Sequence, residues 1–210
     1  MKKLGTFLLA SVALVAVSCS SAEGEATEDE VVVIESVTYS LDTTNSSLVW
    51  AANMGPDYGH EGLVDITEGS IVMEGEALTS GSFTVDMNTI RATGMEEEKA
   101  GYLRAHLMGT APDEDHPANL FFNSVEFPTI GITLGEYKDG MLGLTLSILG
   151  KELSQDVAVE LTSDENGASI NGEFALDLNS LEIPGLQPNP EDGSQINPAI
   201  DFKLNVALTK

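Results

Sequence analysis

Residues 141–161, with the sequence MLGLTLSILGKELSQDVAVEL, decide the fold class. Apolar side chains recur there at every second position, in a first run of Leu142, Leu144, Leu146 and Ile148 and a second run of Val157, Val159 and Leu161. A period of two places such side chains on one face of a β-strand. The segment Leu149-Gly150-Lys151 between the runs is typical of a tight turn, so the stretch predicts an antiparallel hairpin.

The rest of the chain from residue 37 onward repeats this pattern. Alternation predicts strands within 130–134, 174–178 and 200–208, and earlier strands are expected at Val37–Asp42, Ser47–Ala51, Gly62–Thr67, Ser70–Glu74 and Ser82–Ile90. The turn signals between strands are Glu68-Gly69, Lys138-Asp139-Gly140 and Asn166-Gly167. About nine or ten strands with short connections predict an all-β fold whose antiparallel sheet is large enough to close into a barrel.

One or two short helices are expected to interrupt the strands. A helix should begin near Thr93-Gly94-Met95-Glu96, where Thr and Glu are spaced as in a capping box. Ala100, Leu103 and Leu107 then fall on one helical face, which predicts that this helix covers or flanks the barrel. The proline-rich segment Leu181–Pro198 is expected to be a long loop before the last strand.

The first 18 residues have the three parts of a secretory signal peptide. Lys2 and Lys3 are followed by an apolar run over 7–17 that ends in small residues. Because this run is shorter than the roughly 20 residues that cross a bilayer as a helix, residues 1–18 are expected to be cleaved. Residues 16–19, AVSC, resemble the lipobox of bacterial lipoproteins, which predicts a lipid anchor on Cys19. An ordinary secreted protein is the alternative.

Residues 19–36 are expected to form an acidic, flexible tether between this anchor and one domain, 37–210. The segment Ser20–Glu30 contains five acids and no aromatic residue, too little apolar surface to offset the entropy of ordering. Removal of two lysines with residues 1–18 changes the net charge from −25 to −27, and this charge repels nucleic acid. We expect a cell-envelope protein, held by its anchor on the periplasmic side or the outer surface of the outer membrane.

Several ordered motifs carry a family resemblance. They are Tyr39-Ser40-Leu41-Asp42, Ser47-Leu48-Val49-Trp50, Gly59-His60-Glu61-Gly62, the strand 81–90, Leu120-Phe121-Phe122, Phe127-Pro128-Thr129-Ile130 and the hairpin 144–151. From Tyr39 to Leu208 the chain thereby resembles the YceI-like domain family. An insertion at 109–118 and the absence of an arginine at 179–181 depart from the family pattern. The resemblance implies an extended, lipocalin-like antiparallel β-barrel that holds a long apolar chain, such as a polyisoprenoid or a fatty-acyl amphiphile.

A set of side chains on predicted inward faces or on the helix is assigned to such a ligand channel. These residues are Trp50, Phe83, Val85, Met87, Leu103, Phe121, Phe122, Leu144, Leu146, Phe174 and Leu176. His60 is added as a candidate partner for a ligand head group at the barrel mouth. For each apolar residue the alternative is ordinary core packing, because the inward side chains of small barrels often fill the interior.

No metal site and no catalysis are expected. His106 and His116 lie near Asp113, Glu114 and Asp115, but this spacing matches no metal motif. The sequence has no nucleophile elbow, phosphate loop or paired-histidine motif, so we expect a protein that is not an enzyme and has no cofactor besides a bound isoprenoid or acyl lipid.

Two functions from different classes follow from these patterns. The first is a membrane-tethered carrier or sequestering protein for an apolar lipid. The second is a cell-surface structural or interaction protein with a solid barrel core, whose acidic loops contact a partner. The oligomeric state is left open, with a homodimer as one option.

Overall fold

The strands of the domain form one antiparallel sheet. A computed structural model of the protein describes residues 35–55, 57–191 and 193–210, so the predicted signal peptide, Cys19 and most of the predicted tether lie outside the described residues. The strands are β1 (Ser36–Leu41), β2 (Ser47–Asn53), β3 (Gly59–Glu74), β4 (Ala77–Thr93), β5 (Thr129–Lys138), β6 (Met141–Ile148), β7 (Lys151–Ala158), β8 (Glu160–Ser163), β9 (Gly167–Asp177) and β10 (Ala199–Thr209). The helical elements are α1 (Glu97–Met108) and the 3₁₀ turns η1 (Asn179–Leu181) and η2 (Pro184–Leu186).

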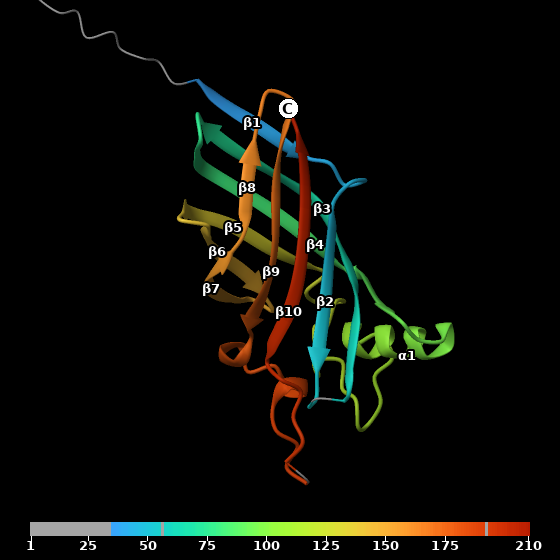
Figure 1. Cartoon of the computed structure of the whole chain (residues 1–210). Helices are drawn as coiled ribbons and strands as arrows, with labels where there is room; N and C mark the ends of the chain where they lie inside the picture. Colours follow the sequence, from blue (N-terminus) through green and yellow to red (C-terminus); the bar gives the residue numbers. More distant parts are fainter. Residues whose placement is uncertain (1–34, 56, 192) are drawn as a thin grey trace, which may run out of the picture. The chain divides into compact units, whose positions relative to one another are not determined.

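The order of the strands shows that the sheet curls into a barrel (Figure 1). That order is β7-β6-β5-β4-β3-β1-β10-β9-β8, and β2 pairs with both β3 and β10. The strands β7 and β8 therefore stand at opposite ends of the order, although they follow each other in the chain. Their connection brings the two sheet edges together and closes the barrel, which confirms the predicted antiparallel all-β fold with one α-helix.

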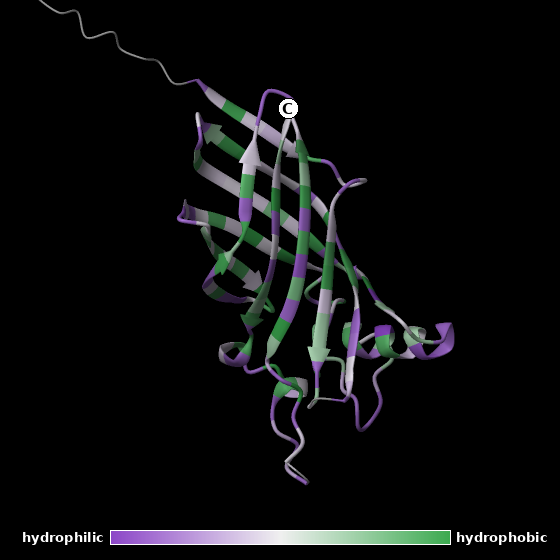
Figure 2. Cartoon of the chain, viewed as in Figure 1, coloured by the Kyte–Doolittle hydropathy of each residue, from purple (hydrophilic) through white to green (hydrophobic). Residues whose placement is uncertain are grey.

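Alternation along the strands builds the core as the sequence predicts (Figure 2). In β6, for example, Leu142, Leu144, Leu146 and Ile148 are buried, and the residues between them are half-buried or exposed. Every buried hydrophobic residue of the described chain lies between Tyr39 and Leu208, so this domain contains its own core.

The turn predicted at Glu68-Gly69 is wrong. The two strands expected on either side of it are one continuous strand, β3, with a register shift against β4 between Ile66 and Glu68. Gly69 is required there for space, because a Cβ on Gly69 would overlap the ring of Phe83 on β4. The glycine therefore marks the close approach of an aromatic side chain within a sheet.

The strand predicted around Val157–Leu161 is divided at Val159. Its first part pairs with β6 and its second part pairs with β9. At the break, the Val159 amide donates a hydrogen bond of 3.0 Å to the carbonyl oxygen of Gly140 in the β5–β6 turn. Gly172 on β9 leaves room for the backbone at Ala158 and Val159, because a Cβ there would lie 2.7 Å from the carbonyl oxygen of Ala158.

Two further local predictions need correction. The predicted capping box does not form, because Thr93 still belongs to β4 and α1 begins after Glu96, whose side chain makes no capping hydrogen bond. The segment Leu181–Pro198 is not wholly irregular, since η1 and η2 bury Leu181, Ile183 and Leu186 against the core. Apolar side chains that reach the core stabilise these short turns despite the prolines.

Candidate functional site: an apolar cavity with a polar mouth

A cavity of about 1190 Å³ occupies the interior of the barrel. Inward side chains of β2 to β7, β9 and β10 line it, together with residues of α1 and of the two 3₁₀ segments. This volume is slightly above the roughly 300–1,000 Å³ of typical small-molecule pockets. The solid core of the alternative hypothesis is therefore not what the barrel contains.

Polar lining is concentrated where β2, β3, β4 and α1 meet. We call this region the mouth, and its polar and charged residues are Asn53, Tyr58, His60, Glu61, Thr93, Glu96, Glu98, Lys99, Tyr102 and His106. The lining side chains that β5, β6, β9 and β10 contribute are all apolar. The cavity is thus amphipathic along its length, which suits a ligand with a polar head and an apolar chain.

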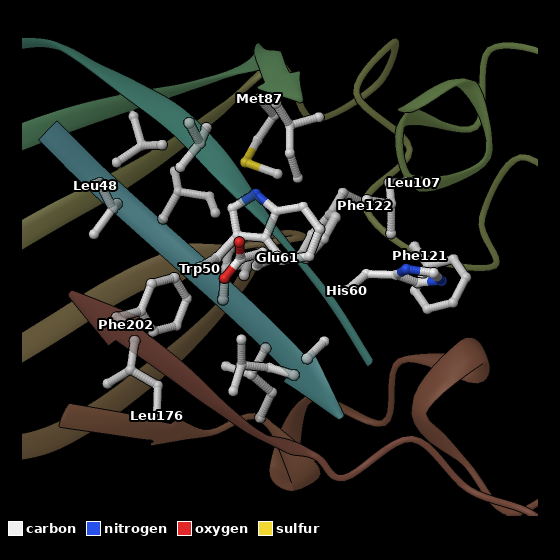
Figure 3. A pocket seen from close by; sticks show the side chains of 18 of the residues that line it. Leu48, Trp50, His60, Glu61, Met87, Leu107, Phe121, Phe122, Leu176 and Phe202 are labelled. Carbon is white, nitrogen blue, oxygen red and sulfur yellow. The ribbon is translucent and has the colours of Figure 1, made fainter. Parts of the chain in front are cut away.

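Trp50 forms part of the wall beside the mouth (Figure 3). It pairs across the sheet with Gly62, and a Cβ at Gly62 would lie 2.7 Å from Cζ2 of the indole. The missing side chain of Gly62 leaves room for the indole against the backbone of β3. The indole Nε1 donates a hydrogen bond of 3.4 Å to the carbonyl oxygen of Leu63, so the polar edge of Trp50 is satisfied within the sheet.

His60 lies on β3 at the mouth. Its Nε2 shares a hydrogen bond of 3.1 Å with the hydroxyl of Tyr58, and the two rings stand edge to face with centroids 5.1 Å apart. Tyr58 is itself 58% exposed, so this pair is open to solvent on one side. His60 therefore lies at the mouth of the cavity with a hydrogen-bond partner already in place, and its contact with a ligand head group stays a prediction.

A second histidine, His106 on α1, also lines the cavity. Its ring packs edge to face against Phe121 at 5.0 Å and against His116 at 4.7 Å between centroids. Burial lowers the pKa of His106 below its usual value of 6.5, the charge of His116 lowers it further, and Asp113 partly offsets both effects. His106 is therefore a neutral part of the wall at pH 7.

The insertion after α1 is held by its own hydrogen bonds. His116 Nδ1 lies 2.9 Å from Oδ1 of Asp113, and the backbone amides of Asp115 and His116 donate to the same oxygen. The bonds from His116 lower the pKa of the Asp113 carboxyl. Among residues 35–55, 57–191 and 193–210, no group of three or more His, Cys, Asp or Glu side chains is placed to hold a metal ion.

The structure brings all twelve sequence-predicted ligand residues to the wall of this one cavity. The half-buried members are His60, Leu103, Phe122 and Phe174, and the buried members are Trp50, Phe83, Val85, Met87, Phe121, Leu144, Leu146 and Leu176. Their contact with a ligand stays a prediction. Sequence reasoning missed other wall residues that the same alternation could have identified, including Ile132, Phe202 and Leu204. It also missed Tyr102 and Lys99, for which no local pattern gives a signal.

The described part of the chain contains no helix with the length and apolarity needed to cross a bilayer. Among curated proteins, none matches the sequence of this chain. Two solved structures share its fold. BcnA of Burkholderia cenocepacia is 13% identical with a TM-score of 0.59, covering 80% of this chain and 98% of its own. A polyisoprenoid binding domain from Saccharophagus degradans, implicated in plant cell wall breakdown, is 15% identical with a TM-score of 0.55, covering 81% and 97%.

The family model agrees with these structural likenesses. The model for the YceI-like domain matches residues 39–208, which is most of the chain and nearly all of the barrel. The chain therefore belongs to the YceI-like domain family.

Proposed function

We propose that this protein binds a long apolar chain, such as a polyisoprenoid or a fatty-acyl amphiphile, inside its barrel and carries or sequesters it. The observation that carries the proposal is the cavity of about 1190 Å³, apolar along β5, β6, β9 and β10 and polar at its mouth. The likeness in fold to a domain described as polyisoprenoid binding supports the same ligand class.

Burial of apolar surface provides the driving force. Each Å² of apolar ligand surface removed from water contributes about 25 cal/mol, so a long chain gains affinity without any specific polar contact. The head group remains at the mouth, where His60, Tyr58 and Asn53 offer hydrogen-bonding groups. Binding of this kind requires no chemical step and no further cofactor, and we propose that the protein is not an enzyme.

Mass spectrometry of organic extracts tests this proposal. The segment 31–210, which includes the whole core, is purified from a bacterial host without detergent and extracted with organic solvent. We expect an isoprenoid or acyl species in stoichiometric amount. A folded protein that carries no lipid and also refuses added isoprenoids would contradict the proposal.

A matched pair of variants on β10 assigns the bound lipid to the cavity. Phe202 lines the cavity and is only half-buried, so Phe202→Asp places a charge in the apolar interior with little loss of core packing. We expect this variant to lose the lipid. The adjacent Asp201 is exposed on the outer face, and Asp201→Ala should retain it.

We further propose that an acyl group on Cys19 tethers the protein to a membrane of the cell envelope. The support is the position of the only cysteine, directly after an apolar run and small residues. Metabolic labelling with a radioactive fatty acid should label the wild-type protein and not Cys19→Ala. Equal labelling of both proteins, or no labelling of either, would contradict acylation of Cys19.

A further inference from the structure

The cavity stops at one level of the barrel, and the barrel continues beyond it. The last lining side chains at that level are Leu134 on β5, Ile170 on β9 and Val206 on β10. Farther along lies a set of buried side chains that do not line the cavity, which we call the end plug: Tyr39, Ile71, Met73 and Leu208. The plug belongs to the end of the barrel that carries β1 and the C-terminal end of β10, away from α1 (Figure 1).

Ile71 lies directly behind the wall of the cavity. It is completely buried on β3 and pairs across the sheet with Gly81 on β4. A Cβ placed on Gly81 would lie 2.7 Å from Cδ1 of Leu134 and 3.1 Å from Cγ2 of Ile71. The two side chains therefore meet over Gly81, with Leu134 facing the cavity and Ile71 closing the space behind it.

Tyr39 closes the barrel end behind Ile71. The two residues are paired across β1 and β3, so their side chains are neighbours on the same face. The Tyr39 hydroxyl donates a hydrogen bond of 2.8 Å to the carbonyl oxygen of Asp164, in the turn between β8 and β9. The ring thus reaches from β1 to a strand connection on another part of the barrel, and it is 5% exposed. A bound chain that grows past Leu134 meets a packed floor.

The length of the cavity above this floor can be estimated from the geometry of the strands. Lining residues on β9 and just after it run from Ile170 to Leu178, a step of eight residues that spans about 26 Å at ~3.3 Å per residue. A strand tilt of about 40° reduces this to a depth of about 20 Å along the barrel axis. An extended alkyl chain advances about 1.3 Å per carbon, given single bonds of about 1.5 Å, so roughly 16 carbons fit.

We propose that the end plug sets the maximum length of the bound chain, with Ile71 as the residue that limits it. This inference rests on the proposed lipid-binding function and adds a length specificity to it. Truncation of Ile71 deepens the cavity by about two carbon positions, because the lost part of the side chain is about two bonds long. A larger side chain at Val206, on the cavity side of the floor, has the opposite effect.

The position of the floor can be measured from the affinities for a series of straight-chain alcohols, from about 10 to about 24 carbons. Each methylene that enters an apolar site tightens binding by about fourfold, and a methylene that finds no room adds nothing. For the wild-type segment 31–210 we expect affinity to rise with chain length up to about 16 carbons and then to stop rising. We call the length at which the rise stops the break. Ile71→Ala should move the break to a length about two carbons greater, and Val206→Phe should move it to a shorter length.

Leu153→Ala is the matched control. Leu153 is buried in the same core, does not line the cavity and loses the same three carbons as Ile71→Ala. Its break should coincide with that of the wild type. A break that stays in place in both Ile71→Ala and Val206→Phe would overturn the inference, and Ile71→Val replaces Ile71→Ala if the larger truncation unfolds. A wild-type protein that binds none of the alcohols would instead refute the lipid-binding function itself.

Discussion

The side-chain amide of Gln155 on β7 donates a hydrogen bond of 2.7 Å to the carbonyl oxygen of Ala175 on β9. The same side chain accepts a hydrogen bond of 3.1 Å from the backbone amide of Asp177. These strands stand on either side of the barrel closure, where β7 pairs with β6 and β9 pairs with β8 and β10. One glutamine thus supplies a donor and an acceptor to backbone groups across the closure.

Replacement of this glutamine should weaken the closed barrel. Gln155→Ala removes two hydrogen bonds, each of which contributes about 0.5–1.5 kcal/mol, so we expect a loss of about 1–3 kcal/mol in the free energy of unfolding. Urea denaturation measures the loss, and hydrogen exchange of the Asp177 amide should become faster. The control is Gln187→Ala, since the side-chain amide of Gln187 makes a long, local bond of 3.5 Å to the carbonyl oxygen of Ile183. Equal effects of the two variants would contradict this role for Gln155.

Gly69 should tolerate no side chain. We expect Gly69→Ala to destabilise the domain by about 1–3 kcal/mol, the usual cost of overpacking, because the added methyl group overlaps the ring of Phe83. Gly131→Ala on β5 is the control, since a Cβ there meets Ser147 at an ordinary 3.8 Å. Thermal unfolding of both variants checks the difference. Trimming of the ring in the double variant Gly69→Ala, Phe83→Leu should recover part of the loss, and strict additivity of the two changes would contradict the contact.

His106 should make the domain sensitive to mild acid. Because burial, and then the charge of His116, lower the pKa of His106 in the folded protein, the unfolded chain binds a proton more readily as the pH falls below about 6.5. Stability should therefore decrease from about pH 6.5 down to the lowered pKa. The Asp113 carboxyl has a lowered pKa as well, so its stabilising contribution is lost only at lower pH, below its usual value of 3.8.

Thermal unfolding as a function of pH separates these two groups. His106→Gln should flatten the decline that begins near pH 6.5 and leave the loss at lower pH in place. Asp113→Asn should remove the loss at lower pH and, because the Asp113 charge raises the pKa of His106, should extend the decline that begins near pH 6.5. An unchanged pH profile in His106→Gln would show that this histidine is not the group that titrates.

The sequence predicted most of the barrel because a period of two is a local signal. The wall positions of β6, such as Leu144 and Leu146, follow from alternation and a tight turn alone. The sequence could not predict the role of Gly69, because a glycine that admits the ring of Phe83 looks the same as a glycine in a turn. The division of the strand at Val159 also depends on a distant partner, the carbonyl group of Gly140.

The site was predicted less completely than the fold. Apolar wall residues could be assigned to an inward face, but alternation does not say whether inward side chains fill the barrel or surround a cavity. That depends on how far side chains such as Phe121 and Phe202 reach across the interior. The mouth was largely missed because it combines His60 on β3 with Tyr102 and His106 on α1, which tertiary folding brings to one opening.

Quenching of the fluorescence of Trp50 tests the central claim most directly. Trp50 is the only tryptophan of the chain and lies in the wall of the cavity, so its emission reports on that space alone. Titration of the segment 31–210 with a long-chain alcohol that carries bromine along its chain should quench the emission saturably, and Phe202→Asp should abolish the effect. Emission that stays unchanged while the protein is folded and the alcohol is in excess would contradict a chain bound inside the barrel.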